Sequence, residues 1–409
     1  MVARMSFFTI ARTIRAPLMA FFAMGIFWGA WHALVPDVKI AVGADDGALG
    51  LALLCVALGA VPAMVLGGRL VDRIEPGLLP ATVLAFGVAA VLPGLAGSPV
   101  ELGAALFVLG LASGMMDVVM NARIGAIEAA TGVRAMHMAH ALFAVVYLVV
   151  ALGTGAARDA ALDPPVILTS VGAAIVALGL VTARLGREDR IARPDLDDVT
   201  PDADGLVRRR IDGPVLLLGI IAFAAFLSEN GWQSWSALFL ERTFEVDPWL
   251  GSMGPAVVGT ALAVGRFGGQ ALAMKVSDAA LIAGAAIVAI AGGTAMALAP
   301  SPIVVFASLF VAAAGASVIA PSALSLAGRT AEPRRRGAAV ATVGVIAYTG
   351  FFVGPAMLGF VADAAGLRTA LGMIAVVLAF VIPCLLVHHA WSDAYLKRPV
   401  STQRKDGLS

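Results

Sequence analysis

The chain has 409 residues, of which 60% are hydrophobic and only 13% charged, and its formal net charge is +1. So little polar surface excludes a water-soluble globule of this size and predicts an integral membrane protein. The two cysteines, Cys55 and Cys384, lie inside apolar runs without a CxxC motif or a His/Cys cluster, which argues against a disulfide framework or a metal site. We therefore expect a lipid bilayer around the protein, no cofactor and no nucleic-acid partner.

Two blocks of almost continuous hydrophobic sequence, residues 16–185 and 213–390, each divide into six apolar runs. Each run has roughly 18 to 25 residues, the length that an α-helix needs to cross about 30 Å of hydrocarbon. We predict an all-α membrane protein of 12 transmembrane helices in two six-helix bundles. The predicted spans are 16–36, 48–68, 77–96, 101–125, 136–157, 165–184, 214–240, 250–273, 279–299, 302–326, 337–362 and 367–389.

These spans divide the chain into an N-terminal bundle (1–185), a charged linker (186–212), a C-terminal bundle (213–390) and a tail (391–409). Charge gathers around the linker, because 15 of the 55 charged residues lie within 184–212. With twelve spans, the termini and the linker share one side, which holds 24 of the 28 Lys and Arg residues. This count assigns Arg266, which lies within the predicted span 250–273, to the charges that follow the eighth span. The four on the opposite side are Lys39, Arg158, Arg242 and Arg368.

Basic residues near span ends resist translocation, so the positive-inside rule places both termini, the linker and the tail in the cytoplasm. We expect a multi-pass protein of a bacterial inner membrane that acts as a monomer. The first apolar run leads directly into further spans, and we interpret it as a retained helix and not as a cleaved signal peptide.

The two blocks repeat one pattern. The motif W-x-x-W-x-A-L begins at Trp28 and again at Trp232, 204 residues later, and Gly114 and Gly315 repeat at nearly the same offset. The repeats favour duplication of a six-helix unit, and therefore two pseudo-symmetric bundles. In transporters built from parallel repeats, the substrate site lies near the middle of the bilayer between the halves.

The turn after the second span, residues 68–73, reads G-R-L-V-D-R and resembles the G-x-L-x-D-R signature of the major facilitator superfamily. The resemblance implies the major facilitator fold and a gating role for Gly68, Asp72 and Arg73. A carboxylate and a cation at a helix end can pair with a neighbouring helix terminus in one state and release it in the other. The second-half copy, residues 269–275, has lost its acidic residues.

Three segments, 116–121, 229–240 and 350–360, resemble the YbjJ-like bacterial permeases, which are distant relatives of fucose-type sugar permeases. This narrower resemblance covers most of the chain. It implies a proton-linked carrier of a small solute, with sugar-like molecules among the candidates.

Two carboxylates interrupt the apolar spans at depth. Asp117 lies in the fourth span with no Lys or Arg within five positions, and Glu229 lies near the centre of the seventh. A charged group at that depth is expensive unless it faces water, a partner or a proton. We predict that Asp117, Glu229 and His140 of the fifth span couple transport to protons. Buried structural acids, and a histidine that anchors the span at the interface, are the alternatives.

Amides and aromatic side chains accompany these acids, and we predict that they bind the solute. Asn121 follows Asp117 by one helical turn, and Asn230 and Gln233 follow Glu229. Amides also clamp helices together in membranes, and tryptophans either form belts at the interface or stack on apolar sugar faces. The predicted substrate-binding residues are Asn121, Asn230, Gln233, Trp31, Trp232, Trp235, Tyr147 and Tyr348.

Together these features predict a secondary active transporter that moves a small polar solute by alternating access, with proton symport as the favoured mode. Proton-coupled export of drugs or metabolites is the alternative. Against export, the fifth span lacks the G-x-x-x-G-P run of the superfamily's antiporters, and the fourth lacks the arginine usual in drug exporters. The sequence contains no H-E-x-x-H, G-x-S-x-G or P-loop motif, which argues against an enzyme.

Overall fold

The computed structural model describes residues 7–71, 77–131, 135–188, 213–331 and 336–396, and every regular element within these ranges is helical. The first half holds α1 (Phe7–Thr13), α2 (Arg15–Ala41), α3 (Asp46–Val71), α4 (Leu78–Ala89), the 3-10 turn η1 (Leu92–Leu95), α5 (Pro99–Thr131), α6 (Met136–Asp159) and α7 (Pro164–Glu188). The second half holds α8 (Gly213–Phe244), α9 (Pro248–Ala273), α10 (Asp278–Ala297), α11 (Pro302–Thr330), α12 (Arg336–Ala365), α13 (Leu367–Ala379) and α14 (Val381–Leu396).

Twelve stretches of the described chain are long and apolar enough to cross a bilayer, which confirms the predicted all-α membrane fold. α4 and η1 together form the third span, and α13 and α14 together form the twelfth. Lipid offers no hydrogen-bond partner to the backbone, so each span must satisfy its own N–H and C=O groups as a helix.

The first span is longer than predicted, because α2 continues past Pro36 for more than a turn. Proline lacks the N–H that one intrahelical hydrogen bond needs. The helix nevertheless continues, because Val35 and Val38 on either side are buried and tertiary packing supplies most of a helix's stability. Asp37 and Lys39 therefore lie on the last turns of a helix and not in a loop.

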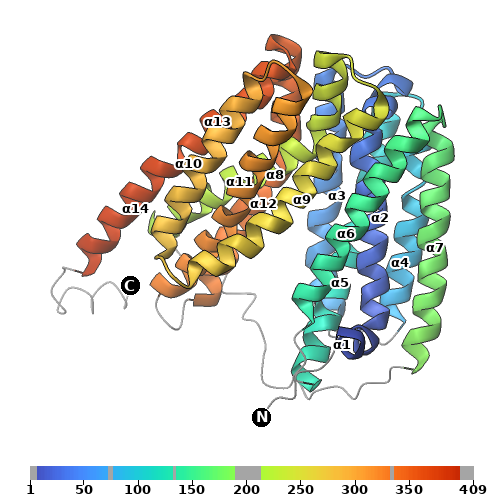
Figure 1. The fold of residues 1–409 in the computed structure, drawn as a ribbon. Coiled ribbons are helices and arrows are strands. Elements are labelled where there is room, and N and C mark those ends of the chain that lie inside the picture. The colour runs from blue at the N-terminus through green and yellow to red at the C-terminus, as the bar shows by residue number, and fades with distance from the viewer. Residues whose placement is uncertain (1–6, 72–76, 132–134, 189–212, 332–335, 397–409) are drawn as a thin grey trace.

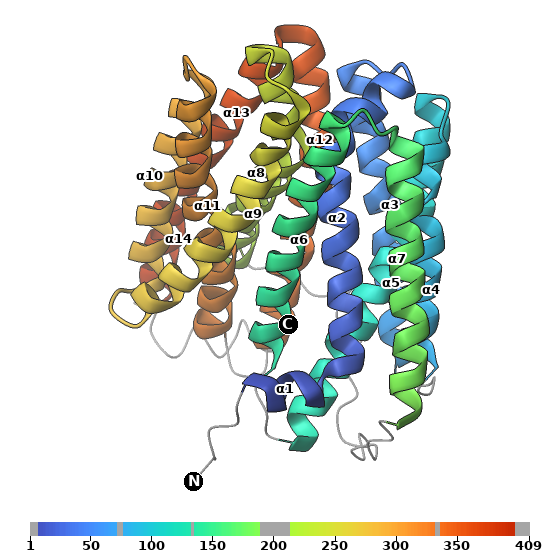
Figure 2. The ribbon, with the colours of Figure 1, turned by 45° about the vertical axis from the view of Figure 1, so that its right-hand side comes forward.

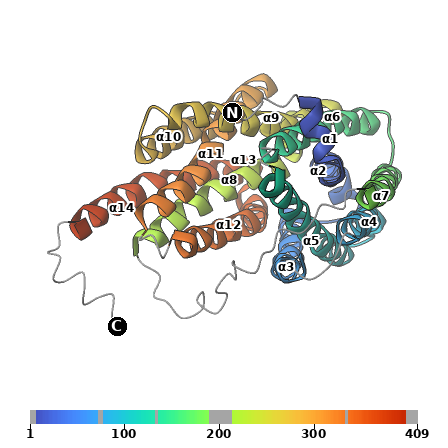
Figure 3. The same cartoon turned by 90° about the horizontal axis from the view of Figure 1, so that it is seen from below.

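The helices form two groups that meet at one end of the molecule and diverge at the other (Figure 1). We call the end where α2 begins and α14 ends the terminal end, and the end where α2 leads into α3 the distal end. The groups touch through α3 with α12, α6 with α9, and α2 with α8 and α9. Figure 2 shows α9 running beside α6. The view from the terminal end shows α2 to α7 on one side and α8 to α14 on the other (Figure 3).

Glycines let helices cross closely within each group. Gly59 of α3 lies against the backbone of Phe107 in α5, and 206 residues later Gly265 of α9 lies against the backbone of Ala314 in α11. Small residues at such crossings allow the close backbone packing that drives helix association in lipid. The same crossing in both groups agrees with the pseudo-symmetry that the sequence repeats predict.

Glycines also mark the crossing of α3 and α12, which joins the two groups at the distal end. A Cβ atom added to Gly50 would lie 2.9 Å from the carbonyl oxygen of Pro355. A Cβ atom added to Gly359 would collide with the carbonyl oxygen of Asp46. The two backbones are therefore in direct contact, and neither position has room for a side chain.

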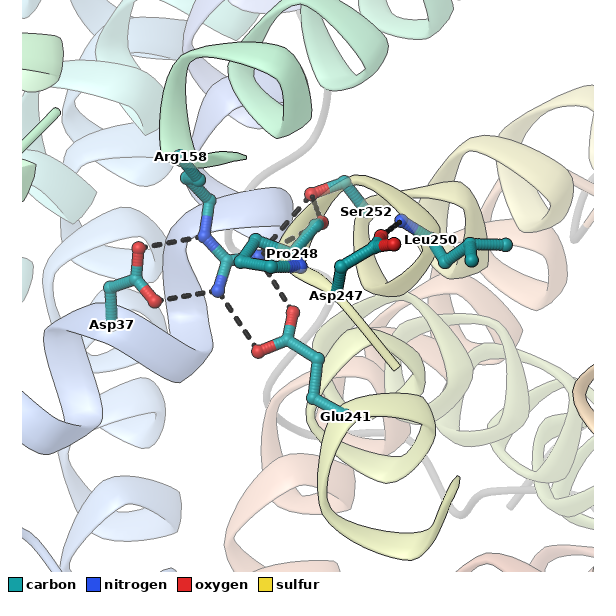
Figure 4. A network of polar contacts seen from close by, with 7 residues as sticks. All are labelled: Asp37, Arg158, Glu241, Asp247, Pro248, Leu250 and Ser252. Carbon is teal, nitrogen blue, oxygen red and sulfur yellow. Dashed lines mark hydrogen bonds and ion pairs between the residues drawn. The ribbon is translucent and has the colours of Figure 1, made fainter. Parts of the chain in front are cut away.

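Arg158, near the end of α6, joins both groups at the distal end (Figure 4). Its guanidinium donates hydrogen bonds of 2.7 and 2.6 Å to Asp37 of α2 and of 2.7 and 3.0 Å to Glu241 of α8. Ser252 of α9 accepts a further, longer bond of 3.3 Å. Such bidentate pairs between charged groups are among the strongest hydrogen bonds in proteins. We call the set Asp37, Arg158 and Glu241 the distal junction.

Asp46, in the first turn of α3, forms a second polar contact at this end. It binds Arg242 of α8 at 2.7 Å and Lys39 of α2 at 3.0 Å. Asp363 of α12 accepts hydrogen bonds from the N–H groups of Asp46 and Gly47 at 2.9 and 2.6 Å. Because the first N–H groups of a helix have no partner within it, a carboxylate of the second group caps a helix of the first.

Arg368, in the first turn of α13, donates hydrogen bonds to the carbonyl oxygens of Ala297 and Ala299 at 2.8 and 2.9 Å. All four cations that the sequence analysis assigned to the side opposite the termini therefore lie at the distal end. Two of them, Arg158 and Arg242, form ion pairs between the groups.

Arg158→Gln is expected to lower the melting temperature of the purified protein, because it leaves Asp37 and Glu241 without a shared cation. Breaking a buried pair costs ~3–5 kcal/mol, and the 28% exposure of the Asp37 side chain places the loss at the lower end of that range. Arg242→Gln is the matched control, because Lys39 still pairs with Asp46 and an exposed ion pair contributes only ~0–1 kcal/mol. Equal melting temperatures for the two variants would contradict a structural role for the distal junction.

Gly359→Leu is expected to destabilise the protein by ~1–3 kcal/mol, because the Asp46 carbonyl cannot move without separating α3 from α12. Gly344→Leu on the same helix is the control, since a Cβ atom there has no neighbour within 4 Å. Thermal unfolding in detergent compares the two variants. If both unfold at the same temperature, α3 and α12 do not cross as closely as described.

Candidate functional site

A cavity of about 1140 Å³ lies between the two groups of helices. At its deep end it is lined by Trp31 and His32, which are buried near the middle of α2. At its other end it is lined by His140, Gln270 and Arg329, which are exposed and lie near helix ends at the terminal end of the molecule. The cavity therefore extends from the middle of the bundle towards the terminal end, while the distal end is closed.

Glu229 and Arg266 form an ion pair in the wall of this cavity. The Nη2 atom of Arg266 in α9 lies 2.9 Å from Oε2 of Glu229 in α8. The Glu229 side chain is 6% exposed, whereas the Arg266 side chain is 52% exposed. The Oε1 atom of Glu229 is buried, and none of the described residues forms a hydrogen bond with it. The sequence analysis counted Arg266 among the charges that flank the eighth span. The structure instead places it within α9, beside a predicted proton-coupling residue.

Asp117 lines the same cavity from α5 of the first group. The Nδ2 atom of Asn121 donates hydrogen bonds to Oδ1 of Asp117 at 3.1 Å and to its carbonyl oxygen at 2.8 Å. No ion pair joins Asp117 to any residue in the described ranges. Asn121 itself does not line the cavity and acts on Asp117, one turn away on the same helix. The cavity therefore receives one carboxylate from each half of the chain.

His32 and Tyr147 form a polar pair at the deep end of the cavity. The Tyr147 hydroxyl lies 2.9 Å from Nδ1 of His32, both side chains are buried, and both line the cavity. The Tyr147 ring also packs on Gly259 of α9, where a Cβ atom would lie 2.9 Å from the ring. Sequence analysis selected Tyr147 but missed His32, although its position one turn after Trp28 in the repeated tryptophan motif was a signal.

Asn230 and Gln233 of α8 line the cavity, as does Trp31 of α2. Asn230 donates a hydrogen bond to the carbonyl oxygen of Phe351 in α12 at 2.5 Å and accepts one from Ser234 at 3.0 Å. Its amide therefore also joins two helices, which is the alternative that the sequence analysis kept open.

Several predicted residues lie elsewhere. Trp232 and Trp235 are fully buried in the hydrophobic core and do not line the cavity. Tyr348 also lies outside the lining, and its ring packs edge-on against Phe226 with ring centres 5.5 Å apart. Of the predicted gating residues, Gly68 is exposed at the end of α3, and Asp72 and Arg73 fall outside the described residues.

Known proteins resemble this chain over nearly its whole length. The family model of the Major Facilitator Superfamily matches residues 18–302 and 271–406. An uncharacterised MFS-type transporter of Yersinia pestis is 31% identical over 364 residues, which cover 88% of this chain and 91% of the relative. Membrane protein MosC of Rhizobium meliloti is 28% identical over 377 residues, which cover 92% and 89% of the two chains.

Solved structures share the fold at low sequence identity. A bacterial homologue of the human lysosomal transporter Spinster, in an inward-facing and occupied conformation, has a TM-score of 0.72 at 16% identity and covers 92% of this chain and 96% of its own. The nucleoside transporter NupG has a TM-score of 0.73 at 12% identity, with coverage of 92% and 98%. Identities this low show similarity of fold alone. Given the family match and the Yersinia relative, this chain belongs to the Major Facilitator Superfamily and is a membrane transporter, not an enzyme.

Proposed function

We propose that this transporter takes up a small polar solute together with a proton, by alternating access of the cavity to the two sides of a bacterial inner membrane. The observation that carries the proposal is the cavity itself, which receives Asp117 from one half of the chain and Glu229 from the other. Because the cavity and both groups of helices come from one chain, a monomer suffices for this function.

Alternating access requires that the site opens to one side at a time. The distal junction closes one end, whereas the cavity lining extends to the terminal end. The distribution of Lys and Arg favours a cytoplasmic terminal end. On that orientation the structure corresponds to an inward-open state, and the outward-open state requires Arg158 to separate from Glu241 of the second group.

Asp117 is the best candidate for proton coupling. A carboxylate inside a membrane protein needs water, a partner or a proton, and Asp117 has hydrogen bonds from Asn121 but no ion pair within the described part of the chain. A proton that binds when the cavity faces one side and leaves when it faces the other would couple solute movement to the proton gradient. Glu229 and His140 line the same cavity and extend the set of titratable groups.

The cavity lining favours a solute with both polar groups and an apolar face. Asn230 and Gln233 offer amide hydrogen bonds, and the half-buried Trp28 offers an indole ring on which an apolar face can stack. The resemblance to the YbjJ-like permeases points in the same direction, towards a small and sugar-like molecule.

Asp117→Asn is expected to abolish gradient-driven accumulation in proteoliposomes while exchange of labelled for unlabelled solute continues. The solute is first identified by a thermal-shift screen, since a ligand stabilises the folded protein by mass action. A gradient of about one pH unit supplies about 1.4 kcal/mol for each proton that enters. Because that free energy corresponds to a factor of about ten in concentration, a one-proton symporter can accumulate its solute about tenfold. The variant is expected to reach only the external concentration.

Glu101→Gln is the matched control, since Glu101 lies on the same helix but is exposed and does not line the cavity. Accumulation by Asp117→Asn at the wild-type level would rule out Asp117 as the coupling residue. If the proton gradient drives the solute out of the cytoplasmic side instead, the protein is the proton-coupled exporter that the sequence left as the alternative.

A further inference from the structure

The ion pair between Glu229 and Arg266 in the cavity wall indicates which charge the solute has. We propose that Arg266 binds the carboxylate of a monoanionic solute, which replaces Glu229 on the guanidinium while Glu229 takes up a proton. This proposal rests on the proposed function, because it names the substrate class and the coupling step of the same cavity.

The geometry makes Arg266, and not Glu229, the partner that a ligand can reach. Half of the Arg266 side chain is exposed, and it lines the cavity. A guanidinium has five N–H donors, and only one Nη2 contact occupies it among the described residues. Glu229 is buried, and its Oε2 atom is already paired with Arg266. A ligand entering from the terminal end therefore meets free N–H donors and a covered carboxylate.

The buried Oε1 atom of Glu229 supplies a second, independent observation. It is buried and has no hydrogen-bond partner among the described residues. A carboxylate oxygen left without a donor in a buried position is costly. Binding a proton removes that cost, because the neutral carboxyl no longer needs the cation beside it. Glu229 is therefore poised to release Arg266 when a competing anion arrives.

Charge conservation favours an anion with a single negative charge. In the observed state Glu229 and Arg266 neutralise each other. After the exchange, the solute carboxylate neutralises Arg266 and the proton neutralises Glu229, so the charge in this wall of the cavity is unchanged. The low dielectric of a membrane protein penalises any net change of buried charge. A neutral solute would leave the pair intact and give it no part in coupling.

Other charged or titratable side chains line the cavity and have to be separated from Glu229 in the test. On the helices packed against α8, Tyr348 of α12, Arg368 of α13 and His388 of α14 do not line the cavity. The lining groups besides Glu229 and Arg266 are His32 of α2, Asp117 of α5, His140 and Tyr147 of α6, Asp278 of α10 and Arg329 of α11.

Asp117 is the feature that would favour a cationic solute instead. It lies on the opposite group of helices and has no ion-pair partner among the described residues. Its oxygen, however, already accepts a hydrogen bond from Asn121, whereas the guanidinium of Arg266 keeps several donors unused. We therefore assign the charged group of the solute to Arg266 and make binding of a cation an outcome of the test.

The test uses two triplets of probes that share a skeleton and differ in charge. They are glucuronate, glucose and glucosamine, and lactate, lactamide and 1-amino-2-propanol. Binding to purified full-length protein is measured by thermal shift and by calorimetry at up to ~10 mM probe, between about pH 5.5 and about pH 8. We expect only carboxylates to bind, with an affinity at least about tenfold higher at the acidic end, where Glu229 is more readily protonated.

Glu229→Gln removes the competing carboxylate and is expected to bind the same carboxylate tightly at every pH. Arg266→Gln is expected to lose carboxylate binding. Arg184→Gln, which removes an exposed arginine of α7 that does not line the cavity, is the control and is expected to bind like the wild type. If Arg266→Gln does not fold, the loss of pH dependence in Glu229→Gln still tests the exchange, because a merely structural glutamate would leave the pH profile unchanged.

Binding of a neutral or cationic probe, no binding of any carboxylate, or an unchanged pH profile in Glu229→Gln would overturn the proposal. Its failure is distinguishable from failure of the proposed function. A neutral solute that is bound and accumulated by the proton gradient leaves symport standing and removes the anion site. A carboxylate that binds with the expected pH dependence but is not accumulated removes symport and leaves the anion site standing.

Discussion

One buried guanidinium at the distal end of this transporter bridges carboxylates from opposite halves of the chain. Arg158 lies between Asp37 and Glu241, and its side chain is completely buried. A guanidinium in such a place is stable only while all its donors are paired, because an unpaired buried charge costs far more than the pair contributes. The proposed alternating access therefore gives the distal end two arrangements, one with the junction formed and one with its charges in water.

The position of the junction makes this alternation feasible. Asp37, Arg158 and Glu241 lie close to the ends of their helices, where separation exposes them to water and not to lipid. Below them, Gly50 and Gly359 let the backbones of α3 and α12 touch without interlocking side chains. In the proposed cycle, the distal junction stabilises the closed state. The crossing of α3 and α12 at Gly50 and Gly359 then allows the halves to separate without pulling interlocked side chains apart.

The cavity, like the distal junction, contains an ion pair between an arginine and a carboxylate. Glu229 and Arg266 form a pair within one half, and Asp117 lies in the other half without an ion pair in the described ranges. Under the proposed function, the proton and the solute therefore bind beside these charges in one cavity. The polar pair of His32 and Tyr147, packed against Gly259, lies between this site and the distal end.

Much of the fold was predictable from sequence, because lipid restricts a spanning segment to one backbone conformation. Apolar run lengths located the twelve spans, and polar residues within them, such as Asp117, Glu229 and Gln233, pointed to the cavity. The side-chain partners of these polar residues were harder to predict. Arg266 looked like a flanking charge, and its pairing with Glu229 depends on how α8 and α9 pack. Trp232 repeats the position of Trp28 in the sequence, yet only Trp28 lines the cavity, because pseudo-symmetric helices need not present the same face.

The central claim is that the two ends of the molecule open alternately. The most direct measurement places spin labels in lipid nanodiscs, one pair at the distal end (Ile40 and Ala365) and one at the terminal end (Arg184 and Met274), on a background without Cys55 and Cys384. All four labelled positions are exposed. The account predicts two populations in which a short distal distance accompanies a long terminal distance, and the reverse. Distances that lengthen together at both ends, or a distal distance that never changes when pH and solute are varied, would contradict it.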